Sequence, residues 1–273
     1  MPEGPEIRLA ADRVASVLVE RPIVEVSFGL PRLRRFRKKL TGATVSKVDT
    51  RGKAMLTRFD NGLTLYTHNQ LYGRWYTVRE RRMPKTSRQL RVALHTPTHS
   101  ALLYSASDIE VLTDKQLARH PFLLRLGPDI LDPALTVEEI VSRLAAMTFR
   151  NRALGSLYLD QGFLAGVGNY LRSEILWAAG IDPARKPGQL ELTALRKLAQ
   201  ETLRISKRSY RTRGVTVSPS LARALKAGGK TYEEFRFHVY GRDGQPCYRC
   251  DTVINRRTMA SRSLFVCSGC QAR

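Results

Sequence analysis

The sequence predicts an α+β fold: a β-sandwich or barrel first, then helices, then a small cysteine ribbon. Three observations predict it. Seven short β-rich segments occupy residues 23–104, an amphipathic helical pattern replaces them after Pro128, and all four cysteines lie within residues 247–270. With 273 residues, 42% of them hydrophobic, the chain can bury substantial cores. A mainly disordered chain is thereby excluded.

The first element is a helix that begins after Pro5. Ile7, Ala11, Val14 and Leu18 fall at helical spacing, so they form one apolar face, which ends before a proline at position 22. Short strands separated by Gly, Pro, Asn or charged turns follow. The expected strands are Ile23–Phe28, Thr44–Asp49, Ala54–Phe59, Leu63–His68, Arg74–Val78, Arg91–His95 and Ala101–Tyr104.

Helical signals dominate the second half of the chain. Thr136 and Glu139 have the spacing of a capping box, which marks a helix start. Further helices are predicted over residues 169–179 and 190–205, since Leu, Ile and Ala recur there at helical intervals. Residues 214–230 lose this periodicity, so we expect a mobile basic loop there. No internal repeat is visible.

The charge balance points to a polyanionic partner. The chain carries 46 Lys and Arg against 24 Asp and Glu, giving a formal net charge of +22 and a pI near 10.5. Basic residues cluster at 32–39, 79–82 and 204–213. Nucleic acid is the expected partner, although a solvated basic surface or a ribosome-associated protein would show the same excess.

The same composition gives expectations about location. No apolar run is long enough to span a membrane, and the N-terminal residues lack the apolar core of a secretory signal. We therefore expect a cytoplasmic protein without a membrane partner. In a reducing compartment its cysteines are not expected to form disulfides.

The four cysteines form the strongest local motif. Two Cys-x2-Cys knuckles, separated by sixteen residues with a β-hairpin pattern, supply four soft thiolates for one zinc ion. Because thiolates fill all four coordination positions, this zinc is expected to be structural. The ligands are Cys247, Cys250, Cys267 and Cys270.

The N-terminus is the second chemical signal. Removal of Met1 exposes the secondary amine of Pro2, and a free α-amino group has a pKa of about 8. Attack of this amine on a sugar C1′ gives a charged iminium, which serves as an electron sink for eliminations. Glu3 and Glu6 lie beside it as proton carriers. A proline in this place is also simply tolerated before a helix.

Three further features admit two interpretations each. Lys53 lies on a glycine turn, where most lysines are merely solvated. Gln70-Leu71-Tyr72 follows a strand and combines groups that fill a gap in a base stack, or it packs a hairpin. The segment 166–169, Gly-Val-Gly-Asn, allows close backbone approach and phosphate binding at a helix start, or a tight turn with an asparagine N-cap.

Two side-chain types receive no chemical role. Glu174 faces the buried side of its helix, where it is expected to accept turn N–H groups structurally. The histidines show no metal-ligand spacing, and none is assigned to catalysis. They are His68, His95, His99, His120 and His238.

Taken together, these motifs resemble the bacterial formamidopyrimidine-DNA glycosylase/endonuclease VIII family. The resemblance rests on the start Met-Pro-Glu-Gly-Pro-Glu, the early turn lysine, Gly-Val-Gly-Asn before a helix and the terminal cysteine ribbon, and it covers essentially the whole chain. The start and the segment 68–73, His-Asn-Gln-Leu-Tyr-Gly, are similar to the endonuclease VIII branch.

The resemblance implies an N-terminal β-sandwich with flanking helices, a C-terminal helix–two-turn–helix domain with a zinc-ribbon finger, and a cleft for double-stranded DNA between them. It implies a DNA glycosylase/AP lyase of base excision repair that needs no redox cofactor or magnesium. The expected divisions are a catalytic domain at 1–128, a DNA-binding domain at 129–214, a basic connection at 215–237 and the zinc finger at 238–272. A monomer is expected because no oligomer seam is evident.

The resemblance also implies residue roles. Pro2 is the Schiff-base nucleophile and Glu3 the acid/base acting on the sugar. Lys53 donates the proton for β-elimination, and Arg262 assists δ-elimination and grips phosphate. Gln70, Arg125 and Asn169 match DNA-contact positions, and Gln70, Leu71 and Tyr72 fill the space left by the flipped base.

Several functions stay open within this framework. The expected substrates are oxidised pyrimidines such as thymine glycol and dihydrouracil; the alternatives are the same chemistry on oxidised purines, or a non-catalytic zinc-ribbon nucleic-acid-binding protein. The sequence departs from relatives at Ser261–Leu264 and in the longer segment Val215–Lys230. Because loops in this family form the base pocket, that second departure bears on lesion preference.

Overall fold

A computed structural model describes residues 2–271. They form two compact units: the first contains Pro2 and Glu6–Arg125, and the second contains Glu3–Pro5 and the chain from Leu126 onward. The predicted α+β class is confirmed, with two sheets in the first unit and a mainly helical second unit that ends in a hairpin. The finer division of the second unit stays a prediction.

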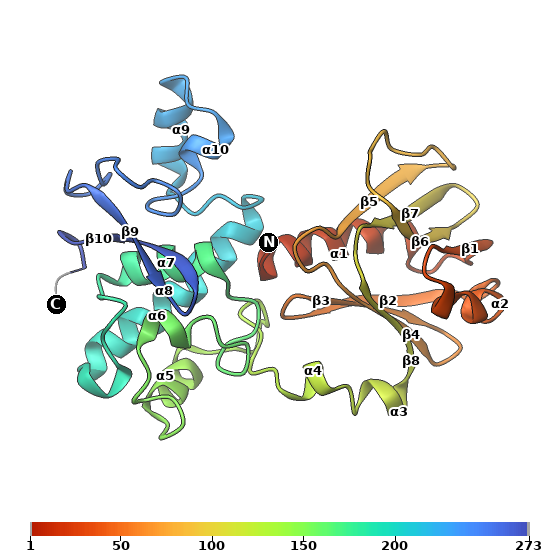
Figure 1. Cartoon of the computed structure of the whole chain (residues 1–273), viewed down its shortest axis with the longest axis horizontal. Coiled ribbons are helices and arrows are strands. Elements are labelled where there is room, and N and C mark those ends of the chain that lie inside the picture. Colours follow the sequence, from red (N-terminus) through yellow and green to blue (C-terminus); the bar gives the residue numbers. More distant parts are fainter. Residues whose placement is uncertain (1, 272–273) are drawn as a thin grey trace. The chain divides into compact units, whose positions relative to one another are not determined.

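The first unit is a sandwich of two four-stranded antiparallel sheets (Figure 1). One sheet has the strand order β1-β6-β7-β5 and the other β2-β3-β4-β8. Its elements are α1 (Gly4–Leu18), β1 (Glu25–Phe28), η1 (Pro31–Phe36), α2 (Arg37–Leu40), β2 (Val45–Arg51), β3 (Ala54–Phe59), β4 (Leu63–His68), β5 (Arg74–Arg79), β6 (Leu90–His95), β7 (His99–Tyr104), β8 (Asp108–Thr113), α3 (Asp114–Leu117) and α4 (Pro121–Leu124).

The core of this unit joins α1 to both sheets. The apolar stripe predicted on α1 is confirmed, because Ile7, Ala11, Val14 and Leu18 are all buried and belong to one cluster with residues of the strands. Burial of the isoleucine, valine and leucine side chains contributes about 1.5–3 kcal/mol each. This packing holds α1 against both sheets of the first unit.

Strand β8 was not expected from the sequence. It pairs with β4 along its whole length, from Leu63↔Thr113 to His68↔Asp108. Asp and Glu are uncommon in strands, so Asp108 and Glu110 masked the apolar alternation of Ile109 and Val111. Its position completes the second sheet beside β4, whose end leads into the segment Gln70-Leu71-Tyr72.

The second unit is built around one buried helix. Residues 170–179 of α7 are all buried, and α5, α8 and β10 pack against it or each other. The elements are α5 (Val137–Ala145), α6 (Leu154–Leu157), α7 (Asn169–Ala179), η2 (Pro187–Gln189), α8 (Leu192–Arg211), α9 (Pro219–Ala227), α10 (Tyr232–Phe235), β9 (Ile254–Met259) and β10 (Arg262–Cys267).

Two helix starts follow the sequence signals closely. Thr136 is the N-cap of α5 and accepts the N–H of Glu139 at 3.1 Å, which is one half of the predicted capping box. Helix α7 has the predicted bounds, but its N-cap is Gly168 and not Asn169. Of the two interpretations left open for this segment, the one with an asparagine N-cap is therefore wrong.

The prediction of a mobile basic loop over residues 214–230 is wrong, because Pro219–Ala227 form helix α9. Ser218 caps helix α9 by accepting the N–H of Leu221 at 3.2 Å, and Pro219 occupies its first turn. A small apolar cluster of Val215, Val217 and Phe235 lies beneath this helix. Leucines at 221 and 225 pack on that cluster, so local burial stabilises a helix that the basic composition concealed.

Among the helices of residues 2–271, none combines the length and apolar character that a membrane-spanning segment requires.

Candidate functional site

The side chain of Glu3 is held at the start of α7. It is 3% exposed, and its carboxylate accepts the backbone N–H groups of Gly168 at 2.8 Å, Tyr170 at 2.8 Å and Leu171 at 3.2 Å. The first N–H groups of a helix have no partner within it, and the helix dipole favours a negative charge there. We call these three N–H groups the Glu3 seat.

Glycines make this close approach possible. A Cβ atom at Gly168 would lie 2.4 Å from the Glu3 carboxyl carbon. A Cβ atom at Gly4 would lie 3.1 Å from the Cα of Gly166, and the N–H of Gly4 donates to the carbonyl of Gly166 at 2.8 Å. The sequence left open whether Gly-Val-Gly-Asn serves close backbone approach and phosphate binding or forms a tight turn with an asparagine N-cap. The observed occupant of this helix start is Glu3.

A buried arginine connects the seat to the C-terminal hairpin. Arg172 is fully buried, and it donates to the side chain of Asn169 at 3.0 Å and to the carbonyls of Met259 and Ser263 at 3.3 and 3.0 Å. Burial lowers its pKa to about 10, against the opposing charge of Glu3. Arg172 thus fixes both ends of the turn that precedes Arg262.

Arg262 begins strand β10 immediately after a tight turn. The two turn residues, Ala260 and Ser261, both have positive φ, 53° and 57°, as in the two-residue turns that match the twist of a hairpin. Arg262 itself is exposed and pairs in register with Met259. Its guanidinium is therefore presented from a rigid strand end.

Glu174 has the structural role that its sequence position predicted. Its buried carboxylate accepts the N–H groups of His238 and Val239 at 2.8 Å and of Tyr240 at 3.0 Å, together with the Thr216 hydroxyl at 2.5 Å. Burial raises its pKa, and these four donors oppose that shift. The carboxylate ties the chain after α10 to α7.

The four cysteines come together as predicted. The sulfur atoms of Cys247, Cys250, Cys267 and Cys270 all lie within 4.8 Å of one another, which lets them bind a single metal ion. The hairpin predicted between the knuckles is confirmed as β9–β10. The cluster lies in the second unit with Glu3, Asn169 and Arg262.

Lys53 and its neighbours form a second group, in the first unit. Lys53 is half-buried on the turn between β2 and β3, after Gly52 with a φ of 59°. The next residue, Ala54, pairs with His68, and His68 pairs in turn with Asp108. Burial lowers the pKa of His68; Asp108 opposes this shift and Lys53 adds to it.

The segment after His68 presents two apolar side chains outward. Leu71 is 52% exposed and Tyr72 68% exposed, while Asn69 beneath them is buried. The N–H of Gly73 closes the turn by donating to the carbonyl of Asn69 at 2.7 Å. We call residues 69–73 the Gln70 loop.

The remaining predicted residues lie at element ends. Arg125 is exposed at the end of α4, where its Nε donates to the carbonyl of Pro121 at 3.1 Å. Pro2 is half-buried and directly precedes Glu3 in the chain. Met1, whose removal the predicted chemistry requires, lies outside the described residues.

The structure thus gathers the predicted residues in two groups. Within the second unit, Glu3, Asn169 and Arg262 surround the start of α7 and its arginine. Within the first unit, Lys53 and Gln70 lie next to the ends of β3 and β4. Sequence reasoning missed Arg172 and His68, although an arginine inside an otherwise buried helix signals a structural contact.

Comparisons with known proteins support the same assignment. Residues 1–107 match the family described as the formamidopyrimidine-DNA glycosylase N-terminal domain, and residues 126–220 match the formamidopyrimidine-DNA glycosylase H2TH domain. Endonuclease 8 from Escherichia coli strain UMN026 is 49% identical over 271 residues, which cover 99% of this chain and 100% of that protein. The chain belongs to the formamidopyrimidine-DNA glycosylase/endonuclease VIII family. Endonuclease 8 from Klebsiella pneumoniae is equally similar, with 49% identity over the same coverage.

Solved structures agree on the fold. The Lactococcus lactis Fpg in complex with DNA containing N7-benzyl-Fapy-dG superposes with a TM-score of 0.81 at 21% identity, covering 100% of both chains. The same enzyme non-covalently bound to AP-site DNA gives a TM-score of 0.80 at 20% identity, covering 99% of this chain and 100% of that one.

These findings confirm several sequence predictions. Membership of the family confirms a DNA glycosylase with AP lyase activity that acts in base excision repair. The predicted fold class is confirmed by the same comparisons together with the sheets and the cysteine cluster.

Proposed function

We propose that this glycosylase removes oxidised pyrimidines, of the thymine glycol and dihydrouracil type, from double-stranded DNA through an imine on Pro2. The observation that carries this proposal is the Glu3 seat: the residue next to the N-terminal amine is a buried carboxylate fixed by three N–H groups. A fixed carboxylate next to a nucleophilic amine can stabilise the positive charge that develops when this amine attacks a sugar.

The first step replaces the base by the protein. After the damaged nucleotide leaves the stack, the Pro2 nitrogen attacks C1′, and the bond between C1′ and the base nitrogen breaks. The base departs with the electron pair and takes up a proton. Because Pro2 is a secondary amine, opening of the sugar ring gives an iminium that carries a positive charge.

Two eliminations then cut the strand. The iminium acidifies the C2′ proton, and its removal gives an enamine that expels the 3′ phosphate. Loss of a further proton from C4′ expels the 5′ phosphate, and water releases the sugar fragment from Pro2. Lys53 is proposed to supply the proton for the first elimination and to hold phosphate, and Arg262 to assist the second.

Glu3 acts on the sugar in this scheme. Its expected role is acid/base catalysis, and its setting adds a second one. A carboxylate that already accepts three N–H bonds is a fixed negative charge, and such a charge stabilises the positive charge that develops at C1′ and on the Pro2 iminium. Preorganised charge of this kind contributes several kcal/mol to catalysis.

The cysteine cluster is proposed to hold one zinc ion. Four thiolates within 4.8 Å of one another fit tetrahedral zinc and leave no open position for substrate, so the ion serves folding. Bound zinc would fix the β9–β10 hairpin, whose strand start carries Arg262. The chain's own residues perform every step of the reaction.

DNA contacts are proposed for polar and apolar side chains of both units. Asn169 and Arg125 bind phosphates or sugar, while Gln70, Leu71 and Tyr72 fill the gap that the flipped nucleotide leaves. Whole-chain similarity to Endonuclease 8 and the Gln-Leu-Tyr sequence of the loop support pyrimidine lesions. A monomer in the cytoplasm stays a prediction.

The test is base release from matched duplexes. Protein lacking Met1 is incubated with duplexes that differ only in carrying thymine glycol, dihydrouracil, or an oxidised purine, and released bases are quantified. Faster release of both pyrimidines is expected. Preferential release of the purine would overturn the proposed substrate class while keeping the chemistry, and no release from any duplex would overturn the proposed function.

A further inference from the structure

The Gln70 loop has a backbone conformation that its own sequence does not favour. Gln70 lies in the left-handed region with a φ of 51°, where residues other than Gly, Asn and Asp are uncommon. The next two side chains, Leu71 and Tyr72, point into solvent. Contacts from elsewhere in the fold must therefore hold this conformation.

His68 provides the first of these contacts. Its Nδ1 accepts the backbone N–H of Gln70 at 3.2 Å. Because the donor is a backbone N–H, Nδ1 carries no proton, so the neutral ring must be protonated on Nε2. The Phe122 ring packs edge-on against His68, with 5.3 Å between the ring centroids, and holds the imidazole in place.

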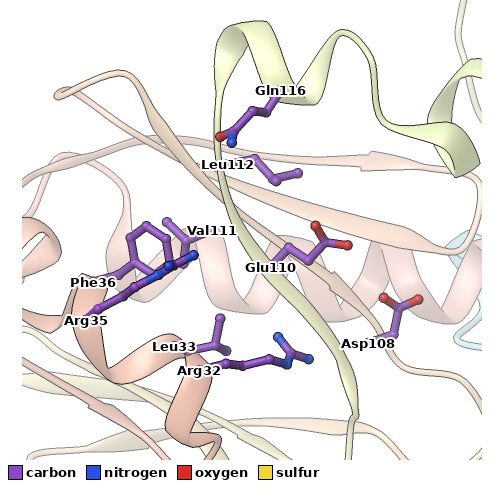
Figure 2. A pocket seen from close by; sticks show the side chains of 9 residues that line it. All are labelled: Arg32, Leu33, Arg35, Phe36, Asp108, Glu110, Val111, Leu112 and Gln116. Atoms are coloured by element: carbon purple, nitrogen blue, oxygen red, sulfur yellow. The ribbon is translucent and has the colours of Figure 1, made fainter.

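Ser107, which directly precedes β8, provides the second contact. Its hydroxyl donates to the side-chain oxygen of Gln70 at 2.8 Å. Arg32 holds Ser107 in turn, because its guanidinium donates to the carbonyl of Ser107 at 2.9 Å and to that of Ile109 at 2.6 Å. Figure 2 shows the Arg32 side chain pointing toward β8, the strand that carries Asp108. Both residues line an open pocket of about 420 Å³.

Strand register brings these contacts to one place. His68 ends β4 and pairs on one side with Ala54, which directly follows Lys53. On the other side it pairs with Asp108, which directly follows Ser107. The backbone and the side chain of Gln70 are thus fixed by residues at the ends of two neighbouring strands, next to the turn that carries Lys53.

We infer that His68 and Ser107 are positioning residues: together they hold Gln70 in its left-handed conformation and so present Leu71 and Tyr72 for insertion into the DNA base stack. This inference rests on the proposed function, because it concerns the extrusion of a damaged base. It assigns roles to two residues that do not themselves touch substrate. Their effect on catalysis acts through the loop.

Two amide substitutions at one position separate this role from general packing. His68→Asn places an oxygen where Nδ1 lies, so it keeps the acceptor for the Gln70 N–H. His68→Gln places its amide near the position of Nε2 and loses that acceptor. Amide hydrogen exchange at Gln70 and single-turnover base excision from a thymine glycol duplex are measured for both, with an abasic duplex as the second substrate.

We expect His68→Gln to speed exchange at Gln70 and to slow excision about tenfold, the effect of one lost hydrogen bond in a preorganised site. His68→Asn should restore both to within about threefold. Cleavage of the abasic duplex, which has no base to extrude, should change little in either variant. Ser107→Ala is expected to slow excision about threefold, and it supplies a second reading if His68→Gln does not fold.

Equal behaviour of the Asn and Gln variants, or unchanged exchange at Gln70 in His68→Gln, would overturn the inference. Unchanged excision in Ser107→Ala would remove Ser107 from it. Failure of the unsubstituted protein to cleave either duplex would instead overturn the proposed function, so the two failures are distinguishable.

Discussion

The Glu3 seat and the Gln70 loop differ in exposure and in the groups that hold them. Glu3 is 3% exposed and is held by main-chain N–H groups of a buried helix. The Gln70 loop exposes Leu71 and Tyr72 and is held by two side chains, those of His68 and Ser107. The group proposed to act on the sugar is thus fixed by backbone N–H groups, whereas the loop proposed to enter the base stack is held by side chains.

This difference sets how substitutions act. Every substitution except one to proline keeps a backbone donor, so the substitution that disturbs the seat most directly is one at Glu3 itself. In the loop, the side chains of His68 and Ser107 each contribute about one hydrogen bond, worth about 1 kcal/mol. Changes at the seat should therefore abolish activity, and changes around the loop should tune it.

The largest effect is expected from Glu3→Gln. Loss of the fixed negative charge should slow base excision about 1000-fold, while affinity for a duplex containing an abasic-site analogue changes less than about threefold. Glu138→Gln, an exposed carboxylate in the first turn of α5, is the matched control. Single-turnover kinetics and anisotropy titrations measure the two quantities, and normal excision by Glu3→Gln would remove Glu3 from the mechanism.

Metal removal should act on the second unit and spare the loop. Stripping the cysteine cluster with a strong chelator is expected to disorder the β9–β10 hairpin and to weaken DNA binding about 10–100-fold, because Arg262 loses its rigid support. Hydrogen exchange at Gln70 should not change. Zinc addition should restore affinity; undiminished binding by protein shown to be metal-free would contradict the role given to the hairpin.

A smaller effect is expected at the tip of the loop. Leu71→Ala should slow excision about tenfold, because it removes most of a side chain proposed to enter the base stack. It should change the free energy of unfolding by less than about 0.5 kcal/mol. Leu192→Ala is the matched control, because both leucines are 52% exposed. If the two variants excise bases equally fast, Leu71 does not enter the base stack.

The smallest effect concerns pH and the support of α7. His238 stacks on Trp177, with 4.1 Å between ring centroids, and burial lowers its pKa to about 3. The unfolded chain binds a proton near pH 6.5 that the folded state does not, so stability is highest above that pH and falls as the pH decreases toward about 3.

At about pH 5.5 this difference should reach about 1.4 kcal/mol. His238→Phe keeps the ring stack and cannot titrate, so its unfolding free energy should depend less on pH by that amount. Urea titrations at several pH values measure the difference between the two proteins, and parallel pH profiles would contradict it.

The sequence predicted elements whose signals are local. The stripe of α1, the bounds of α7 and the cysteine cluster follow from spacing along a single segment. Helix α8 continues past Ile205, where the prediction ended it. The prediction stopped there because the buried positions that follow are serines, which hide the apolar periodicity. At α9 the signal was present, since Ser218-Pro219 is a good helix start, but basic composition outweighed it.

Contacts between distant segments could not be predicted. The Glu3 seat joins residues 165 or more positions apart, and nothing near Glu3 or Gly168 indicates the other. The sequence around His68 likewise gives no indication of its hydrogen bond to the N–H of Gln70. The chemical character of each side chain could be predicted from the sequence, whereas its hydrogen-bond partner depended on the fold.

The most direct test asks which amine attacks the sugar. Protein lacking Met1 is reduced with borohydride in the presence of an abasic-site duplex, and the trapped peptide is sequenced by mass spectrometry. An adduct on the nitrogen of Pro2 is expected, and no adduct is expected when Met1 is retained. An adduct on Lys53, or trapping by protein that keeps Met1, would contradict this expectation.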